Sequence, residues 1–280
     1  MSARDDSAAP YGDATKPVRR TTTADVAKRK GGEPLVCLTA YDAPTAALLD
    51  PHCDVILVGD SLGMVVHGLP STVGVTLEMM SLHAKAVMRG AARALVVVDM
   101  PFGSYEKSPR QAFDNASRLL IETGAQAIKL EAGPYAAATI RFLVERGVPV
   151  MGHVGLRPQA VNVTGGFKAR GRSDDDRAAV MAEAIAASEA GAFAIVVEGV
   201  AQDLAREVTE TIAAPTIGIG ASAACDGQIL VTEDMLGVFE RTPKFVRKFE
   251  DLRSDIAAAA EAYAAAVRAR SFPGEAELYK

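Results

Sequence analysis

The sequence predicts an α/β protein built on a single (β/α)8 TIM barrel. From Leu35 onward, short runs rich in β-branched residues alternate with longer amphipathic stretches, which is the pattern of a parallel sheet covered by helices. A glycine that ends a predicted helix leads directly into the next strand at Gly124, Gly147 and Gly191, as in repeated βα units. The length of 280 residues suits one barrel of about 250 residues.

Eight apolar runs are predicted as strands, and the last of them is the weakest. They are 35–41, 55–59, 94–100, 127–131, 148–153, 194–198, 215–219 and 228–231. Eight consecutive βα units favour a closed barrel over an open sheet. An open doubly wound sheet remains the structural alternative.

Helix signals lie between these strands. The segment Ser-Pro-Arg-Gln at 108–111 combines a capping box with proline at the first helical position, and it predicts a helix that ends at Gly124. Another helix is predicted from Ser173 to Gly191, with three aspartates in its first turn, where negative charge suits the helix dipole. Both helices therefore have a defined start and stop.

The two ends of the chain differ from the middle. Residues 1–18 have no apolar periodicity, so we expect a flexible tail there. A catalytic barrel domain is expected over 19–280. Its alanine-rich stretch at 255–270 predicts a final helix packed outside the barrel.

Composition limits the function. The chain is 49% hydrophobic and 23% charged, enough to bury a sizeable core. A formal charge of −5 gives little support for a nucleic-acid partner, so we expect small-molecule partners.

No apolar run approaches the roughly 20 residues of a membrane span, and no secretory signal is recognisable, so we expect no membrane partner and a cytoplasmic protein. The three cysteines, Cys37, Cys53 and Cys225, lack the close pairs of a zinc site and the density of a disulfide-rich protein, so we expect them to be reduced structural thiols.

Ionisable residues fall at the ends of five consecutive predicted strands. They are Asp60, Asp99, Lys129 with Glu131, His153, and Glu198. In a β/α barrel these strand ends meet at the mouth where the chemistry takes place. Any one carboxylate after a strand is equally explained as a helix cap or a solvated loop residue. Their recurrence on five strands favours a shared site.

The carboxylates of this ring predict a metal ion. Three carboxylates in a partly dry pocket repel one another unless a cation offsets their charge. Oxygen ligands without paired histidines or cysteines favour a hard cation such as Mg²⁺ over zinc. Such an ion can bind a 2-oxo acid and stabilise the enolate formed at its neighbouring carbon.

Individual roles follow from position. Glu198 is the candidate base, since it lies on a different strand from the other carboxylates and is flanked by Val196 and Val197; a structural salt-bridge partner is the alternative. Lys129 is a candidate for binding a substrate carboxylate. His153 is a candidate for donating a hydrogen bond to the developing oxygen, with a satisfied core histidine as the alternative.

Several motifs together point to one family. They are LTAYDAPTA, LVGDSLGMVVHG, VVVDMPFGSY, AIKLE, PVMGHVGLRPQ, GGFKARGR, IVVEGV, CDGQILV and SFPGEAE. With them the chain resembles the ketopantoate hydroxymethyltransferase family from about residue 28 to 279. The resemblance implies a barrel of the phosphoenolpyruvate/pyruvate type and a Mg²⁺-dependent transferase of pantothenate (coenzyme A) biosynthesis. Its members move a hydroxymethyl unit from 5,10-methylenetetrahydrofolate to 3-methyl-2-oxobutanoate, giving 2-dehydropantoate and tetrahydrofolate.

The resemblance also implies residue roles. Asp60 and Asp99 match the family's metal ligands, with Glu131 as a third through water. The 2-oxo acid contacts match Asp60, Ser61, Asp99 and Lys129, the motif histidine matches His153, and the proton acceptor matches Glu198. A homodecamer is implied as well.

Two segments depart from the family pattern. Ser222 stands where the family usually has glycine in GIGAG, and Arg170 stands where it has glutamine in VQGR. These departures concern the folate side of the site and leave the metal and base positions intact.

Two other functions remain open at this point. One is a Mg-dependent 2-oxo acid lyase or mutase of the isocitrate lyase type, which a cysteine in a mouth loop would favour; Cys37 lies instead within the first predicted strand. The other is a non-catalytic barrel that binds a 2-oxo acid or folate. Substrate turnover distinguishes a binding protein from an enzyme.

Overall fold

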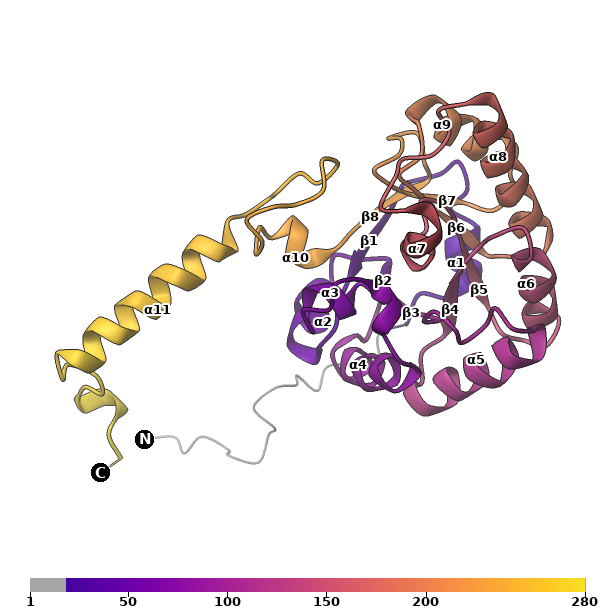
Figure 1. Cartoon of the computed structure of the whole chain (residues 1–280). Coiled ribbons are helices and arrows are strands. Elements are labelled where there is room, and N and C mark those ends of the chain that lie inside the picture. Colours follow the sequence, from indigo (N-terminus) through magenta and orange to yellow (C-terminus); the bar gives the residue numbers. More distant parts are fainter. Residues whose placement is uncertain (1–18, 280) are drawn as a thin grey trace. The chain divides into compact units, whose positions relative to one another are not determined.

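Eight parallel strands close into a barrel in the order β1 to β8, so the predicted fold is confirmed (Figure 1). The computed structural model describes residues 19–279, and the tail expected at 1–18 lies outside the described residues. The strands are β1 (Leu35–Thr39), β2 (Val55–Val58), β3 (Leu95–Asp99), β4 (Ala127–Glu131), β5 (Val150–Gly155), β6 (Ala194–Glu198), β7 (Thr216–Ile219) and β8 (Gly227–Leu230). Each predicted strand overlaps the observed one.

Helices follow the strands and surround the barrel (Figure 1). The longer ones are α2 (Ala43–Leu49), α4 (Leu77–Gly90), α5 (Pro109–Thr123), α6 (Ala136–Val144), α8 (Asp174–Glu189) and α9 (Gln202–Thr211). Shorter elements are α1 (Thr23–Ala27), α3 (Leu62–Val65), α7 (Val161–Thr164) and the 3-10 turns η1 (Thr72–Gly74) and η2 (Pro158–Ala160). This arrangement leaves the strand ends as the openings of the barrel.

Helix α5 begins and ends where the sequence predicts. The Ser108 side chain accepts a hydrogen bond from the backbone N–H of Gln111 at 3.2 Å, which satisfies one free donor of the first turn. The reciprocal half of the capping box is displaced by one residue, since the Gln111 side chain accepts from the N–H of Lys107 at 3.0 Å. Gly124 ends the helix with a φ of 77°, a conformation that glycine adopts without strain.

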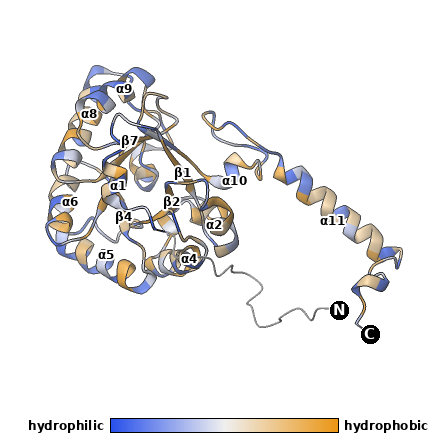
Figure 2. Ribbon diagram, turned by 180° about the vertical axis from the view of Figure 1, so that it is seen from behind, coloured by the Kyte–Doolittle hydropathy of each residue, from blue (hydrophilic) through white to orange (hydrophobic). Residues whose placement is uncertain are grey.

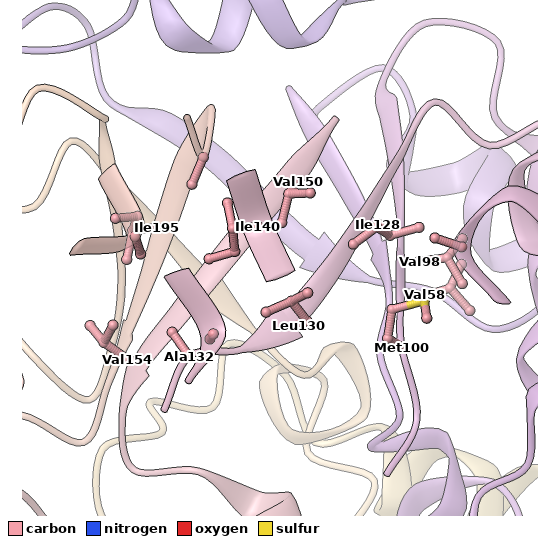
Figure 3. Packing of buried hydrophobic residues seen from close by; sticks show 14 of the residues in the cluster. Val58, Val98, Met100, Ile128, Leu130, Ala132, Ile140, Val150, Val154 and Ile195 are labelled. Carbon is pink, nitrogen blue, oxygen red and sulfur yellow. The ribbon is translucent and has the colours of Figure 1, made fainter. Parts of the chain in front are cut away.

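Two layers of apolar side chains hold the barrel together. Side chains on the outer face of the strands, among them Val98, Ile128 and Val150, pack against the helices. Ile140 of α6 belongs to the same cluster and packs against the strands from the helix side (Figure 3). A second cluster, which includes Leu95 and Val97, fills the barrel interior. Figure 2 shows the apolar strands inside a ring of helices that carry both hydrophilic and hydrophobic residues.

The chain divides into two compact units, one that ends at Ile229 and one that begins at Leu230. The second unit contains α10 (Thr232–Met235), α11 (Leu252–Arg268) and η3 (Glu275–Glu277). The predicted alanine-rich helix is confirmed as α11, and none of its residues is buried. Its packing outside the barrel, and a single domain over 19–280, stay predictions.

Candidate active site

The ring of ionisable residues lies at the carboxyl ends of β2 to β6. Asp60 follows β2, Asp99 ends β3, and Glu198 ends β6. Neighbouring strands align Asp99 with Lys129, and Glu131 with His153. All of these side chains are buried except that of Glu198, which is 17% exposed. The sequence-predicted residues therefore meet in one place.

Strand periodicity explains why these side chains share the barrel interior. Successive side chains of a strand point to opposite faces, so residues two apart lie on the same face. On β3 the interior residue Val97 is followed two positions later by Asp99. On β5 the interior residue Met151 is followed in the same way by His153. Strand β5 continues for two residues beyond the predicted end, because Gly155 pairs with Glu198 of β6.

Lys129 holds the acidic residues of the ring together. Its Nζ lies 2.7 Å from Oδ1 of Asp99, and the other oxygen of Asp99 accepts a hydrogen bond from the backbone N–H of Asp60 at 3.0 Å. Burial disfavours the charge on Lys129, but Asp99 and Asp60 more than offset this and raise its pKa. Burial and the charge on Asp99 raise the pKa of Asp60 to about 7. The pocket therefore carries more negative charge than one lysine neutralises.

Gln159 connects two of the acids, a contact that the sequence interpretation missed. Its side-chain N–H donates to Oδ2 of Asp60 at 2.8 Å, and its backbone N–H donates to Oε1 of Glu131 at 3.1 Å. Tyr105 completes the connection by donating from its hydroxyl to Oε1 of Gln159 at 2.6 Å. Burial and the charge on Asp60 raise the pKa of Glu131 well above its usual range. The family motif that ends in Gln159 was the one available sequence signal.

His153 lies between Lys129 and Glu198. Its Nδ1 is 3.4 Å from the ammonium of Lys129, and its Nε2 is 3.3 Å from Oε2 of Glu198. Because an ammonium only donates, Nδ1 accepts and the imidazole proton lies on Nε2. Nε2 is close to the Glu198 carboxylate, but the angle between them is not that of a hydrogen bond. Nε2 therefore has no hydrogen-bond partner among the described residues. This N–H is free for a substrate oxygen.

Ser61 is positioned by the strand before it and by a tyrosine. Its Oγ lies 2.7 Å from the hydroxyl of Tyr41. A Cβ placed at Gly59 would lie 2.7 Å from Ser61 Oγ and 3.6 Å from Oδ2 of Asp99, so a larger residue there would displace the Ser61 hydroxyl. Ser61 thus lies beside the ring of ionisable residues, and its contact with the 2-oxo acid stays a prediction.

The residues present fit a hard cation held by two carboxylates. Burial and the charge on Asp99 raise the pKa of Asp60 to about 7, and a bound cation would offset that charge; Asp99 Oδ1 already contacts Lys129 Nζ at 2.7 Å. No group of three or more His, Cys, Asp or Glu side chains within residues 19–279 is arranged to hold a metal ion. Glu131 as a third ligand through water stays a prediction.

Ser222 is accommodated within the turn after β7. Its side chain is buried, with its Oγ accepting from the N–H of Ala224 at 3.2 Å. Its backbone carbonyl accepts from the Gln228 side chain at 2.8 Å. The hydroxyl that replaces the family's glycine is therefore bonded within its own turn.

Comparison with known proteins identifies a family. A family model described as "Ketopantoate hydroxymethyltransferase" matches residues 20–275. A protein of Phenylobacterium zucineum is 68% identical over 262 residues, which cover 94% of this chain and 95% of that protein. A protein of Hyphomonas neptunium is 69% identical over 260 residues, covering 93% and 94% of the two chains. Both are named 3-methyl-2-oxobutanoate hydroxymethyltransferase.

Solved structures of low sequence identity share the fold. A putative phosphonomutase from Burkholderia cenocepacia has a TM-score of 0.60 at 18% identity, covering 76% of this chain and 93% of its own. A 2,3-dimethylmalate lyase described as a PEP mutase/isocitrate lyase superfamily member has a TM-score of 0.57 at 16% identity, covering 93% of both chains. At this identity the likeness shows the barrel fold and no more, so it gives no support to the lyase alternative.

Proposed function

The chain belongs to the ketopantoate hydroxymethyltransferase family, and from that premise we propose how its barrel mouth carries out the family's reaction. The enzyme transfers a hydroxymethyl unit from 5,10-methylenetetrahydrofolate to 3-methyl-2-oxobutanoate and gives 2-dehydropantoate and tetrahydrofolate. In atoms, C3 of the oxo acid loses a proton and bonds to the methylene carbon, while the bonds from that carbon to N5 and N10 of the folate break. Water supplies the hydroxyl oxygen, and the proton from C3 and one proton from water end on the two folate nitrogens.

Glu198 is the proposed proton acceptor. Its carboxylate is the most exposed of the ring at 17%, so it borders the space that a substrate enters. Its charge helps to raise the pKa of both Asp60 and Glu131, which places it within electrostatic reach of the metal-binding side. A base at this position takes the proton from C3 while the keto group is held on the opposite side. The position of Glu198 is the observation that carries the proposal.

The remaining residues bind and orient the oxo acid. Lys129 provides a buried ammonium for the substrate carboxylate or the developing oxygen, while its contact with Asp99 at 2.7 Å keeps it in place. The free Nε2–H of His153 donates to an oxygen of the substrate, and Ser61 contributes its hydroxyl. Gln159 keeps Asp60 and Glu131 at a fixed separation. Fixed donors of this kind stabilise charge as it develops.

Mg²⁺ is the proposed cofactor, held by Asp60 and Asp99. When bound there it would polarise the keto oxygen of the substrate and favour loss of the proton from C3. Two carboxylates with waters and substrate oxygens form the usual environment of this ion in enzymes.

Deuterium exchange at C3 tests the proposal directly. The substrate 3-methyl-2-oxobutanoate is incubated in D₂O with the protein, with and without Mg²⁺, and without folate. We expect exchange that requires the metal, and we expect Glu198→Gln to lower the exchange rate by about 10³-fold, within the usual range for loss of a general base. Glu210→Gln, an exposed glutamate on α9, is the matched control.

Each outcome has a defined meaning. Exchange that is unchanged in Glu198→Gln removes Glu198 as the base. No exchange with the intact protein, metal and substrate contradicts the proposed reaction and favours a binding protein.

Assembly and location complete the proposal. Family resemblance supports a homodecamer, which sedimentation or light scattering measures directly. It also supports a cytoplasmic enzyme, which cell fractionation tests. Among the described helices, none has the length and apolar character that crossing a membrane requires.

A further inference from the structure

A buried tyrosine outside the ring of ionisable residues is linked to the ring through one amide. Tyr105 lies in the segment between β3 and α5, and its side chain is buried. Its hydroxyl donates to Oε1 of Gln159 at 2.6 Å and accepts from the backbone N–H of Glu131 at 3.3 Å. Tyr105 therefore holds a side chain that in turn contacts the site.

The direction of the hydrogen bonds at Tyr105 is set by a backbone group. The N–H of Glu131 can only donate, so the phenol oxygen accepts from it. The phenol proton is then left for the Gln159 side chain, and only the carbonyl oxygen of an amide can accept that proton. Tyr105 therefore requires that Oε1 of Gln159 faces it.

The opposite end of the amide meets groups of the opposite kind. Nε2 of Gln159 donates to Oδ2 of Asp60 at 2.8 Å and to the backbone carbonyl of Met100 at 2.9 Å. A backbone carbonyl only accepts, and so does an ionised carboxylate. Turning the amide over would place its oxygen against two acceptors with no proton between them, which is costly for a buried group. The amide therefore has one favoured orientation, and its partners at both ends agree on it.

This amide fixes one oxygen of Asp60 and leaves the other. The backbone of Asp60 is held as well, since its N–H donates to Oδ2 of Asp99 at 3.0 Å. Within residues 19–279, Oδ1 of Asp60 makes no hydrogen bond or ion pair. A carboxylate held at one oxygen presents the other in a fixed direction, and partners that orient a ligand in this way raise its affinity for a metal ion.

We propose that Tyr105 is a positioning residue, which acts through the Gln159 amide to hold the Asp60 carboxylate in the orientation that binds the metal ion. The inference rests on the proposed function, because it takes Asp60 to be a metal ligand. The alternative is that Tyr105 only fills space beside the loop after β5. A phenyl ring would fill the same space, so the hydroxyl alone carries the proposed role.

The test measures metal affinity with Mn²⁺, which suits the same oxygen ligands as Mg²⁺. Electron paramagnetic resonance follows free Mn²⁺ during titration of wild type, Tyr105→Phe and Gln159→Met. Tyr105→Phe removes only the hydroxyl, and Gln159→Met keeps an unbranched side chain of similar length without the amide. We expect the affinity for Mn²⁺ to fall about tenfold in Tyr105→Phe and about 30-fold in Gln159→Met, in the range found for groups that orient metal ligands.

Two exposed residues provide matched controls. Tyr263 is 60% exposed on α11, and Gln202 is exposed at the start of α9. Tyr263→Phe and Gln202→Met make the same chemical changes away from the barrel mouth residues. Both should bind Mn²⁺ as wild type does.

A double-mutant cycle shows whether Tyr105 acts through Gln159. In the Gln159→Met background, Tyr105→Phe should change the affinity for Mn²⁺ by no more than about twofold, because the amide that it orients is absent. A second tenfold loss in the double variant would contradict a route through Gln159.

Urea denaturation of the same variants separates positioning from packing. If Tyr105→Phe loses stability but binds Mn²⁺ as wild type does, the role of the tyrosine is structural and the proposal is wrong. If Gln159→Met does not fold, the comparison of Tyr105→Phe with Tyr263→Phe still decides the matter.

Wild type distinguishes failure of this inference from failure of the proposed function. Wild type that neither binds Mn²⁺ nor exchanges deuterium at C3 refutes the proposed function, and this inference with it. Wild type that does both, together with a Tyr105→Phe protein of equal Mn²⁺ affinity, overturns the role of Tyr105 alone.

Discussion

The two halves of the barrel interior have opposite chemistry although the same strands build both. Toward the amino ends of the strands, the interior is filled by apolar side chains such as Val97 on β3 and Met151 on β5. Toward the carboxyl ends, the next inward positions hold Asp99 and His153. Along each of these strands, the change from apolar to ionisable inward side chains takes place within two residues, about 7 Å.

This difference shows how the fold holds charges that repel one another. The apolar half at the amino ends of the strands, here called the lower half, is close-packed and fixes the spacing of the strands. The ionisable half at their carboxyl ends, the upper half, gains strong electrostatic interactions in a dry environment, but its buried charges cost stability. We therefore expect substitutions in the upper half to reduce activity far more than stability, and substitutions in the lower half to do the reverse.

The largest expected effect comes from Asp99→Asn in the upper half. The change removes one proposed metal ligand and the ion-pair partner of Lys129 at 2.7 Å while it keeps the shape of the side chain. We expect the rate of C3 exchange at low Mg²⁺ to fall about 10³-fold, equivalent to roughly 4 kcal/mol of transition-state stabilisation. Exchange rates over a series of Mg²⁺ concentrations measure this.

Asp114→Asn provides the control for Asp99→Asn. Asp114 is an exposed aspartate on α5, and its substitution should leave both rate and metal dependence unchanged. An Asp99→Asn protein that keeps the Mg²⁺ dependence of wild type contradicts the assignment of Asp99 as a ligand.

Met151→Ala in the lower half is expected to have the opposite effect. Met151 is 1% exposed and packs within the interior cluster, so its truncation leaves a cavity. We expect the free energy of unfolding to fall by about 3 kcal/mol, measured by urea denaturation. The KM for 3-methyl-2-oxobutanoate should remain within about twofold of wild type under native conditions.

Leu48→Ala is the matched control for Met151→Ala, because the Leu48 side chain is 75% exposed and its truncation should leave stability nearly unchanged. A large rise in KM in Met151→Ala would show that the apolar half also sets the geometry of the site. The comparison between the two halves would then have to be abandoned.

The polar half could be predicted from the sequence because it depends on strand periodicity. Each strand is a short apolar run, and the polar residue at its end is visible without coordinates, as Asp99 is after three valines. The ring therefore follows from the fold class alone. The alignment of Asp99 with Lys129 required the register of the barrel, which no single strand reveals.

Contacts made by loops could not be predicted in the same way. Gln159 lies in η2 after β5, and a neutral amide in a loop gives no signal of its own. Its bonds to Asp60 and Glu131 depend on how the loop folds back over the mouth. Arg157, Lys168 and Arg170 line one cavity although they are separated by up to 13 positions in the sequence, and periodicity does not relate them.

Asp226 offers the smallest and most specific test, because it is an ionisable residue at the amino end of a strand. Its carboxylate precedes β8 and accepts hydrogen bonds from the N–H of Gly31 at 2.7 Å and of Thr216 at 2.8 Å, and from Lys30 at 3.1 Å. Burial opposes ionisation, but these donors outweigh it and lower the pKa of Asp226. We expect Asp226→Asn to cost about 2 kcal/mol of unfolding free energy at pH 7.

The pH dependence of this loss distinguishes a charge effect from lost packing. A carboxyl with a folded-state pKa below its unfolded value of about 3.9 contributes its full stability above that value. The contribution is lost as the pH falls through the folded-state pKa. The stability difference between wild type and Asp226→Asn should therefore be constant from pH 7 to pH 5 and shrink below about pH 4, as urea midpoints at several pH values will show. A difference that persists unchanged at low pH would mean that the shape of Asp226, rather than its charge, ties β7 to the segment before β1.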